Sequence, residues 1–257
     1  MKLFSRTYGS GPPLLILHGL LGSGGNWHTL ASRTFAPFFT VFAVDLRNHG
    51  KSPHDDEFSF GAMVRDLVDF IDEIANGQIG VIGHSLGGKV AMRLALDHPD
   101  RIDRLVSVDI APRAYPDGHT PIFQALKKLD LDSFGDRRAI DGALATDIPD
   151  AAVRGFLLQN VIRNGDSFSW RMNLRAIEEG YPKILEAVTS SRPFMGPTLF
   201  IRGGDSNYVR SGDESSIRKL FPAARIETIK NAGHWVHADQ PAEFADRVLS
   251  FLTENSV

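Results

Sequence analysis

The chain has 257 residues, of which 42% are hydrophobic and 23% are charged, and its formal net charge is −3 with neutral histidines. This length suits one globular domain with a large core, and the absence of cysteine excludes disulfides, thiolate metal sites and a cysteine nucleophile. With 28 Lys and Arg against 31 Asp and Glu, the chain lacks the basic excess typical of proteins that bind nucleic acid.

The N-terminal segment becomes polar before any apolar stretch of the length that a secretory signal needs. The longest early apolar run, Leu14 to Leu17, ends at His18 and is too short to cross a bilayer. We therefore expect a soluble, cytoplasmic protein with no membrane span, present as a monomer or a small homo-oligomer.

Short apolar runs alternate with longer helical patterns along most of the chain. The runs lack clean alternation of polar and apolar residues, which predicts strands that are buried on both faces. This order predicts an α/β fold, with a mostly parallel central sheet and helices on both faces. The predicted strands are 14–17, 41–44, 79–82, 105–108, 198–201 and 225–229, and the predicted helices are 60–75, 86–97 and 242–252.

Residues 111–193 depart from this order, because they carry helix-like stretches and no strong strand signal. A loop of this length without secondary structure is rare in a compact domain. We therefore expect a helical cap at 111–193, inserted into an α/β catalytic core formed by 1–110 and 194–257. The expected breaks between its helices are Pro116, Pro121, Gly135, Pro149, Gly165 and Pro182.

The strongest chemical signal is Gly83-His84-Ser85-Leu86-Gly87, which follows a predicted strand and precedes a predicted helix. This is the Gly-x-Ser-x-Gly pattern of a nucleophile elbow in the setting that it requires. Glycines two residues on either side of the serine remove Cβ atoms that would collide in so tight a turn. The N-terminus of the following helix also favours a developing negative charge, so Ser85 is the predicted nucleophile.

The same segment admits a nucleotide-binding interpretation. Gly83, four further residues and Gly88-Lys89 match a P-loop except at the last position, where Val90 replaces serine or threonine. Valine has no hydroxyl that could bind Mg²⁺, and a P-loop would leave the other marked loops unexplained. We therefore favour the nucleophile elbow.

A serine nucleophile needs a base and an acid that orients the base. We predict His234 as the base, because it follows the last predicted strand in a loop at the carboxyl edge of the sheet. His234 and His237 have the spacing of a metal pair, but no carboxylate-rich motif accompanies them, so we expect no metal. Two residues could serve as the acid, because Asp109 and Asp205 each follow a predicted strand. The Gly-Gly turn before Asp205 slightly favours Asp205. Asp109 could instead be the N-cap residue at the start of the insertion.

The oxyanion is expected to bind two backbone amides. One is the amide of Leu86, directly after the nucleophile, and the other is the amide of Leu20, in the loop after the first core strand. Gly19 lets that loop turn sharply and leaves the Leu20 N–H free to point inward. Residues 45–52 are predicted to be structural, with an arginine and an aspartate that brace neighbouring loops.

Six segments together resemble the bacterial YbfF-type esterase family of α/β-hydrolases over residues 14–253, least so in the insertion. The segments are 18–19, 45–52, 83–89, 108–112, 203–209 and 232–237. The resemblance implies an α/β-hydrolase fold and hydrolysis of carboxylic esters, or of acyl thioesters, under a helical cap without a metal or organic cofactor.

The resemblance also bears on the acid. In that family the aspartate of the Asp-Ile-Ala-Pro segment, here Asp109, orients the histidine. The position of Asp205 is often asparagine in the family, followed by a serine that joins the hydrogen-bond network and that matches Ser206. The resemblance therefore favours Asp109, with Ser206 as a bridge to His234, while the aspartate at 205 departs from the family and keeps the second acid open.

We therefore expect a carboxylesterase-type serine hydrolase that acts through an acyl-enzyme on a small-molecule ester or thioester, with no nucleic-acid partner. Thioesterase, perhydrolase and carbon–carbon hydrolase chemistry remain open, as does a ligand receptor or signalling protein on the same fold. Four large side chains are expected to line the substrate pocket: Phe168, Trp170, Met172 and Tyr208.

Overall fold

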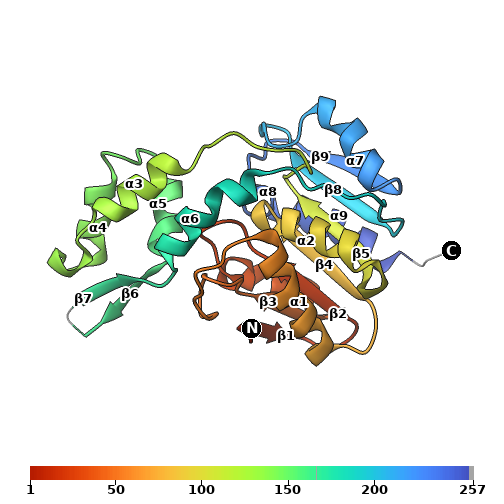
Figure 1. The fold of residues 1–257 in the computed structure, drawn as a ribbon, viewed down its shortest axis with the longest axis horizontal. Helices are drawn as coiled ribbons and strands as arrows, with labels where there is room; N and C mark the ends of the chain where they lie inside the picture. The colour runs from red at the N-terminus through yellow and green to blue at the C-terminus, as the bar shows by residue number, and fades with distance from the viewer. Residues whose placement is uncertain (166, 255–257) are drawn as a thin grey trace.

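The computed structural model describes residues 1–165 and 167–254, and its centre is a seven-stranded sheet (Figure 1). The strand order is β1-β3-β2-β4-β5-β8-β9, and all pairings are parallel except that of β1 with β3. The predicted mostly parallel sheet is confirmed. The strands are β1 (Ser5–Tyr8), β2 (Pro13–Leu17), β3 (Thr40–Val44), β4 (Ile79–His84), β5 (Ile102–Val108), β8 (Thr198–Gly203) and β9 (Ala224–Ile229).

Strand β1 is the member of this sheet that the sequence did not predict. It has four residues, none of them fully buried, and it pairs only with β3 at the edge of the sheet. An edge strand this short shows little apolar pattern, because one of its sides has no neighbouring strand.

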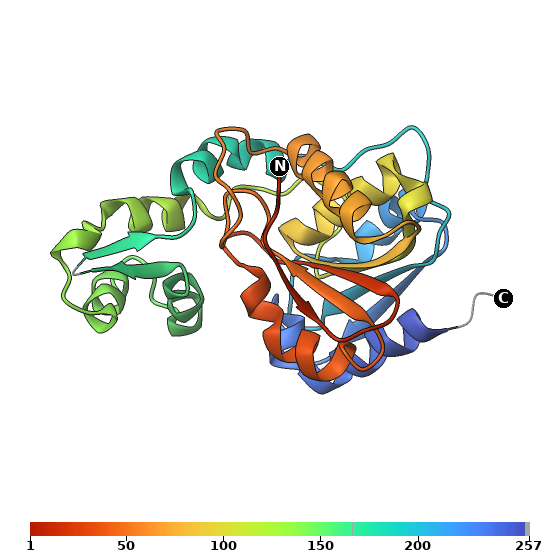
Figure 2. The ribbon, with the colours of Figure 1, turned by 90° about the horizontal axis from the view of Figure 1, so that it is seen from below.

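Helices cover both faces of the sheet (Figure 2). Helices α1 (Phe60–Ile74) and α2 (Leu86–Asp97) pack on the face to which Leu15 and Leu17 point. The other face, with Leu14 and Ile16, is covered by the π-helical segment Leu30–Phe35 and by α9 (Pro241–Thr253). Because successive side chains of a strand alternate between faces, burial on both sides requires the continuous apolar run 14–17.

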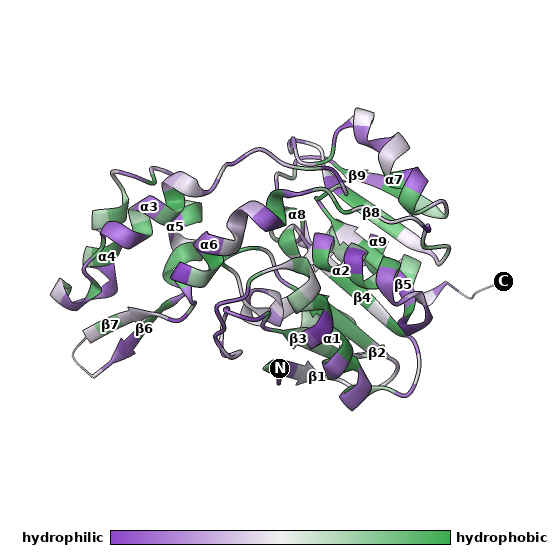
Figure 3. Cartoon of the chain, viewed as in Figure 1, coloured by the Kyte–Doolittle hydropathy of each residue, from purple (hydrophilic) through white to green (hydrophobic). Residues whose placement is uncertain are grey.

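The distribution of hydropathy follows these layers. Figure 3 shows hydrophobic colours along the central strands and hydrophilic colours on the outward turns of α1. Two shorter helices, α7 (Glu214–Leu220) and α8 (Val236–Asp239), lie near β8 and β9. No helix within the described ranges is long and apolar enough to cross a membrane.

Most of the segment 111–193, from residue 120 to about 180, lies to one side of the sheet in both views, and its last residues return along α2 to the core (Figures 1 and 2). Besides its helices this segment contains an antiparallel hairpin, which corrects the expectation of helices alone. Each strand of the hairpin has four residues, too few to show a period that the sequence could reveal. The elements are α3 (Thr120–Lys128), α4 (Arg137–Leu144), α5 (Ala151–Leu158), β6 (Val161–Asn164), β7 (Ser167–Trp170) and α6 (Leu174–Leu185).

Helix α6 continues through Pro182, where the sequence predicts a break. Proline removes one backbone hydrogen bond from a helix, but the buried Tyr181 and Ile184 on either side of it hold the chain in place. Of the other expected breaks, Pro121 lies in the first turn of α3 and Gly165 follows β6 with a positive φ of 61°.

The C-terminus of α6 is tied to the core by Lys89 of α2. The Lys89 side chain is buried, and its Nζ donates hydrogen bonds to the carbonyl oxygens of Ile184 at 3.1 Å, Leu185 at 3.3 Å and Glu186. The last carbonyl groups of a helix have no partner inside it and carry the negative end of its dipole. Burial lowers the pKa of Lys89 to about 8, so its ammonium is mostly protonated at pH 7. Lys89, the lysine of the rejected P-loop pattern, thus binds the carbonyl groups at the C-terminus of α6.

We predict that Lys89→Met lowers the free energy of unfolding by about 2–3 kcal/mol, because three carbonyl groups lose a charged donor. Urea denaturation measures the change. Arg93→Met is the matched control: Arg93 also lies on α2 and donates to the Thr189 carbonyl, but its side chain is 31% exposed. The control variant should lose less than about 1 kcal/mol. Equal losses in the two variants would contradict the role assigned to Lys89.

Candidate active site

Ser85 occupies the turn between β4 and α2 with φ 52° and ψ −116°, a backbone conformation that residues other than glycine rarely adopt. A Cβ at Gly83 would lie 2.2 Å from the carbonyl oxygen of Gly87, and a Cβ at Gly87 would lie 2.4 Å from that of Leu17. Neither position can therefore carry a side chain. The strand-turn-helix setting expected from the sequence is present, and it leaves Ser85 half-buried at the carboxyl edge of the sheet.

His234 and Asp109 meet at the same edge. His234 lies between β9 and α8, and its Nδ1 is 2.8 Å from Oδ2 of Asp109, the residue that follows β5. Asp109 is fully buried and also accepts hydrogen bonds from the Gly203 amide at 3.1 Å and from Ser206 Oγ at 2.5 Å. Because a carboxylate can only accept, the hydrogen of the neutral imidazole is on Nδ1, and Nε2 of His234 is left with a free lone pair.

The structure brings Asp109, and not Asp205, to His234. Asp205 is exposed, and within the described part of the chain its carboxylate has no hydrogen bond or ion pair. Ser206 donates to Asp109 Oδ2, the oxygen that also faces His234, so it contacts the carboxylate and not the histidine. The turn after β8 explains why Asp205 is exposed and Ser206 is not. The backbone amide of Asp205 donates to the Ala232 carbonyl at 2.9 Å, and the side chain of Ser206 points to Asp109.

Leu20 and Leu86 line one cavity together with Ser85; Leu20 lies in the loop after β2, and Leu86 is the first residue of α2. Neither N–H has a hydrogen-bond partner among residues 1–165 and 167–254. The next amide, that of Leu21, donates to Nε2 of His49 at 3.1 Å. Backbone N–H groups without a partner are the kind of donor that suits a negatively charged oxygen.

Two buried histidines hold the loop that carries Leu20. His18 accepts from the Leu46 amide at 3.0 Å with Nε2, and its Nδ1 donates to the Gly19 carbonyl at 2.8 Å. His49 accepts from Leu21 with Nε2 and donates from Nδ1 to the Arg47 carbonyl at 3.0 Å. Burial lowers the pKa of His18 to about 4 and that of His49 to about 3. Both rings are therefore neutral at pH 7, which these mixed donor and acceptor roles require.

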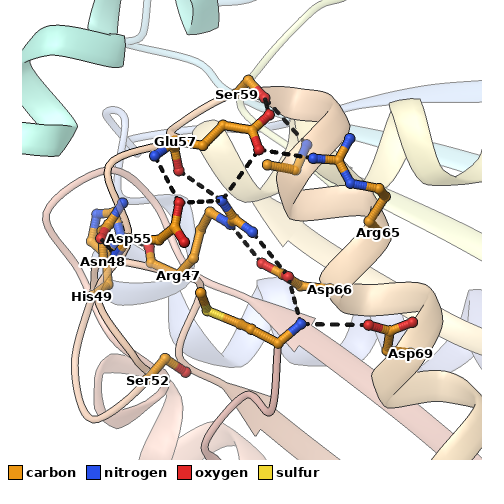
Figure 4. A network of polar contacts seen from close by, with 12 residues as sticks. Arg47, Asn48, His49, Ser52, Asp55, Glu57, Ser59, Arg65, Asp66 and Asp69 are labelled. Atoms are coloured by element: carbon orange, nitrogen blue, oxygen red, sulfur yellow. Dashed lines mark hydrogen bonds and ion pairs between the residues drawn. The ribbon is translucent and has the colours of Figure 1, made fainter.

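Arg47 anchors the loop of residues 45–52 to α1 (Figure 4). Its guanidinium donates to both carboxylate oxygens of Asp66, at 2.6 Å and 3.0 Å, and to the Glu57 carbonyl at 2.7 Å. Asp45 of the same loop accepts from the Gly24 amide at 2.7 Å. The arginine and the aspartate thus brace neighbouring loops, as the sequence predicts.

Aromatic rings surround His234. Tyr208 stacks on it with ring centroids 3.7 Å apart, and the buried His84 donates from Nε2 to the His234 carbonyl at 2.9 Å. His237 stacks on Trp27 at 4.2 Å, and burial lowers its pKa to about 3. Burial also lowers the pKa of His84 well below its ordinary value. The sequence had not identified the roles of His84 and Trp27, because only the fold brings them to this edge.

Two cavities open at Ser85, and Tyr208, one of the four expected pocket residues, lies on the walls of both. The other predicted pocket residues, Phe168, Trp170 and Met172, line neither. Phe168 and Met172 are buried in the hydrophobic core, and Trp170 packs against it. This corrects the expectation: strand β7 and the turn after it complete the packing of the insertion, and the walls at Ser85 come from other segments.

Five large side chains line the two cavities although the sequence did not identify them as pocket residues: Tyr115, His119, Tyr181, Phe156 and Trp235. Helical periodicity indicates which face of a helix an aromatic residue occupies, but not whether that face packs a core or lines a cavity, and a loop has no such period. Among the described residues, no group of three histidine or carboxylate side chains is arranged to hold a metal ion.

Comparison with known proteins places this geometry in a family. Residues 12–241 match the family model described as the alpha/beta hydrolase fold. The chain is 42% identical over 248 residues to the sn-1-specific diacylglycerol lipase ABHD11 of Mus musculus, covering 94% of this chain and 81% of that protein. It is 35% identical over 245 residues to esterase YbfF of Escherichia coli, covering 94% and 93%.

Among solved structures, a marine microorganism esterase superposes with a TM-score of 0.95 at 39% identity, covering 98% of this chain and 99% of that one. The resemblance to YbfF-type esterases is thereby confirmed. The matched family model, the seven-stranded sheet and the relatives named esterase and lipase agree: the chain belongs to the α/β-hydrolase family and is a hydrolase enzyme.

Proposed function

We propose that the protein is a serine hydrolase that cleaves carboxylic esters through an acyl-enzyme on Ser85, with His234 as base and Asp109 as the acid that orients it. The observation that carries the proposal is the 2.8 Å hydrogen bond between buried Asp109 and His234, at a cavity that Ser85 also lines. With its Nδ1 hydrogen held by Asp109, the ring offers Nε2 to the serine hydroxyl.

In the proposed mechanism, Ser85 Oγ attacks the ester carbonyl carbon while His234 Nε2 takes the hydroxyl proton. The resulting oxyanion accepts hydrogen bonds from the Leu20 and Leu86 amides. The carbon–oxygen bond to the alcohol then breaks, and the imidazolium returns its proton to the leaving oxygen. Water repeats the sequence on the acyl-enzyme, releases the carboxylic acid and regenerates Ser85.

Asp109 favours the imidazolium that forms during each step, because a buried carboxylate stabilises a positive charge at hydrogen-bond distance. Ser206 and the Gly203 amide hold that carboxylate in place. Stacking of Tyr208 on the imidazole, with the ring centroids 3.7 Å apart, restricts rotation of the histidine ring. We assign Ser206 and Tyr208 positioning roles.

We further propose that residues 111–193 act as a cap over the site. Their side chains supply walls to both cavities at Ser85, including Tyr181 and Ile184 in one and Val153 and Phe156 in the other.

The relatives named diacylglycerol lipase and esterase support ester substrates. Acyl thioesters remain a second substrate class for the same chemistry.

We predict that Asp109→Asn lowers kcat by about 10⁴-fold with 4-nitrophenyl butanoate, because the histidine loses the partner that selects its tautomer. Asp205→Asn is the matched control and should change kcat by less than about threefold, since an exposed side chain without partners is replaced. Ser85→Ala should abolish turnover. A large loss in Asp205→Asn with an active Asp109→Asn would reverse the assignment of the acid.

A second prediction concerns the oxyanion loop. His49→Phe keeps a ring against Phe58, 5.8 Å away, but removes the acceptor for the Leu21 amide, so the neighbouring Leu20 N–H loses its fixed direction. We expect kcat to fall by about 10–100-fold at nearly unchanged KM, because the lost interaction acts in the transition state. Steady-state kinetics measures both constants.

The control for this variant is His54→Phe. His54 is an exposed histidine, and within residues 1–165 and 167–254 its side chain makes one hydrogen bond, in which Nε2 lies 3.0 Å from the Arg171 carbonyl. Its replacement should leave kcat within about twofold. If kcat fell by a similar factor in both variants, the effect of His49→Phe would come from a general loss of stability and not from the oxyanion loop.

A further inference from the structure

Ser85 stands where two cavities of unequal size meet. The smaller has a volume of about 250 Å³ and the larger about 930 Å³. Five residues line both cavities and form the waist between them: Leu20, Ser85, Gly118, His119 and Tyr208. An ester bound at Ser85 therefore has two directions in which its halves can extend.

The proposed catalytic groups divide unequally between these directions. His234 lines only the larger cavity, whereas Leu86 lines only the smaller one and Leu20 lines both. The leaving oxygen must lie next to the base that protonates it. Once the oxyanion takes the position between the two amides, the acyl chain is left with the direction away from His234.

We propose that the smaller cavity is the acyl site and that the larger cavity binds the alcohol. This inference rests on the proposed esterase function of Ser85. It makes the enzyme selective for short and medium acyl groups and tolerant of large alcohols. A cavity of about 150 Å³ holds benzene, so about 250 Å³ corresponds to an acyl chain of roughly ten carbons.

The smaller cavity suits an uncharged acyl chain. Its three cationic side chains among the described residues already have partners. Lys89 binds the carbonyl groups that end α6, and Arg113 binds Asp213 and the Tyr208 carbonyl at 3.2 Å. Arg210 donates to the Asn207 carbonyl at 3.2 Å. The Asp117 carboxylate accepts from backbone amides, among them that of His119. The apolar walls are Leu20, Leu86, Ile110, Ile184 and Leu185.

The larger cavity suits an uncharged alcohol with apolar parts. Trp27, Phe156 and Trp235 supply aromatic walls, and among the described residues that line it there is no lysine or arginine. The pKa values of His84 and His237 are lowered by burial, so neither ring adds positive charge at pH 7. A leaving group that carries phosphate would find no cationic partner there.

The test uses two isomeric esters, dodecyl butanoate and butyl dodecanoate, dispersed in the same detergent. Because the isomers contain the same atoms, their partition into micelles is nearly equal, and only the direction of the ester differs. We expect dodecyl butanoate to show at least about tenfold higher kcat/KM, since a twelve-carbon acyl chain exceeds the smaller cavity. Equal rates, or preference for butyl dodecanoate, would overturn the assignment while leaving the esterase function intact.

Two matched variants locate the effect. Ile184→Phe narrows the smaller cavity, and Val153→Phe narrows the larger one. Across ethyl esters of C2 to C10 acids and butanoate esters of C2 to C12 alcohols, Ile184→Phe should shorten only the accepted acyl chain and Val153→Phe only the accepted alcohol. The reverse pattern would overturn the assignment.

A second experiment varies the charge of the leaving alcohol and tests the proposed alcohol class independently of chain length. We expect 1-butanoylglycerol to be hydrolysed at least about tenfold faster, as kcat/KM, than 1-butanoylglycerol 3-phosphate. Preference for the phosphate would overturn the proposed alcohol class. If neither ester nor 4-nitrophenyl butanoate is hydrolysed in a Ser85-dependent reaction, the proposed function itself fails, and the assignment of cavities fails with it.

Discussion

The buried carboxylate of Asp109 is the group on which the arrangement of this edge of the sheet depends. A charge without solvent costs several kcal/mol unless donors surround it. Here the donors come from three places in the chain: the Gly203 amide at the end of β8, Ser206 in the loop that follows, and His234 after β9. The carboxylate therefore requires β5, β8 and β9 to be neighbours and to end at the same level.

The second constraint acts on the loop that carries Leu20, which is held by two neutral histidines and not by a charged group. His18 and His49 each bridge two backbone segments, and they direct the loop that presents the Leu20 amide. The insertion touches the same loop, because Asn160 donates to the Leu21 carbonyl at 2.7 Å and Asn26 donates to Gln159. The proposed oxyanion site is thus held by the core and by the cap together.

Much of this could be predicted from local patterns. The strands buried on both faces appear as continuous apolar runs, and the elbow appears as two glycines around Ser85, because both depend on nearby residues. Local patterns slightly favoured Asp205 and the family resemblance favoured Asp109, so the sequence left the choice between the two acids open. Both follow strands, and only the turn that exposes Asp205 and directs Ser206 inward separates them. The pocket residues Phe168, Trp170 and Met172 were wrong for the same reason, since apolar side chains pack a core and line a cavity equally well.

The sequence by itself determined the fold class, the tight strand-turn-helix at Ser85 and the set of candidate groups, because backbone geometry and hydrophobic burial leave their marks within a few residues. Only the tertiary structure decided which carboxylate meets His234, which amides stay unpaired and how two cavities divide the space at Ser85. Those outcomes depend on contacts between residues far apart in the chain, such as the 125 positions between Asp109 and His234. Local pattern carries no information about such contacts.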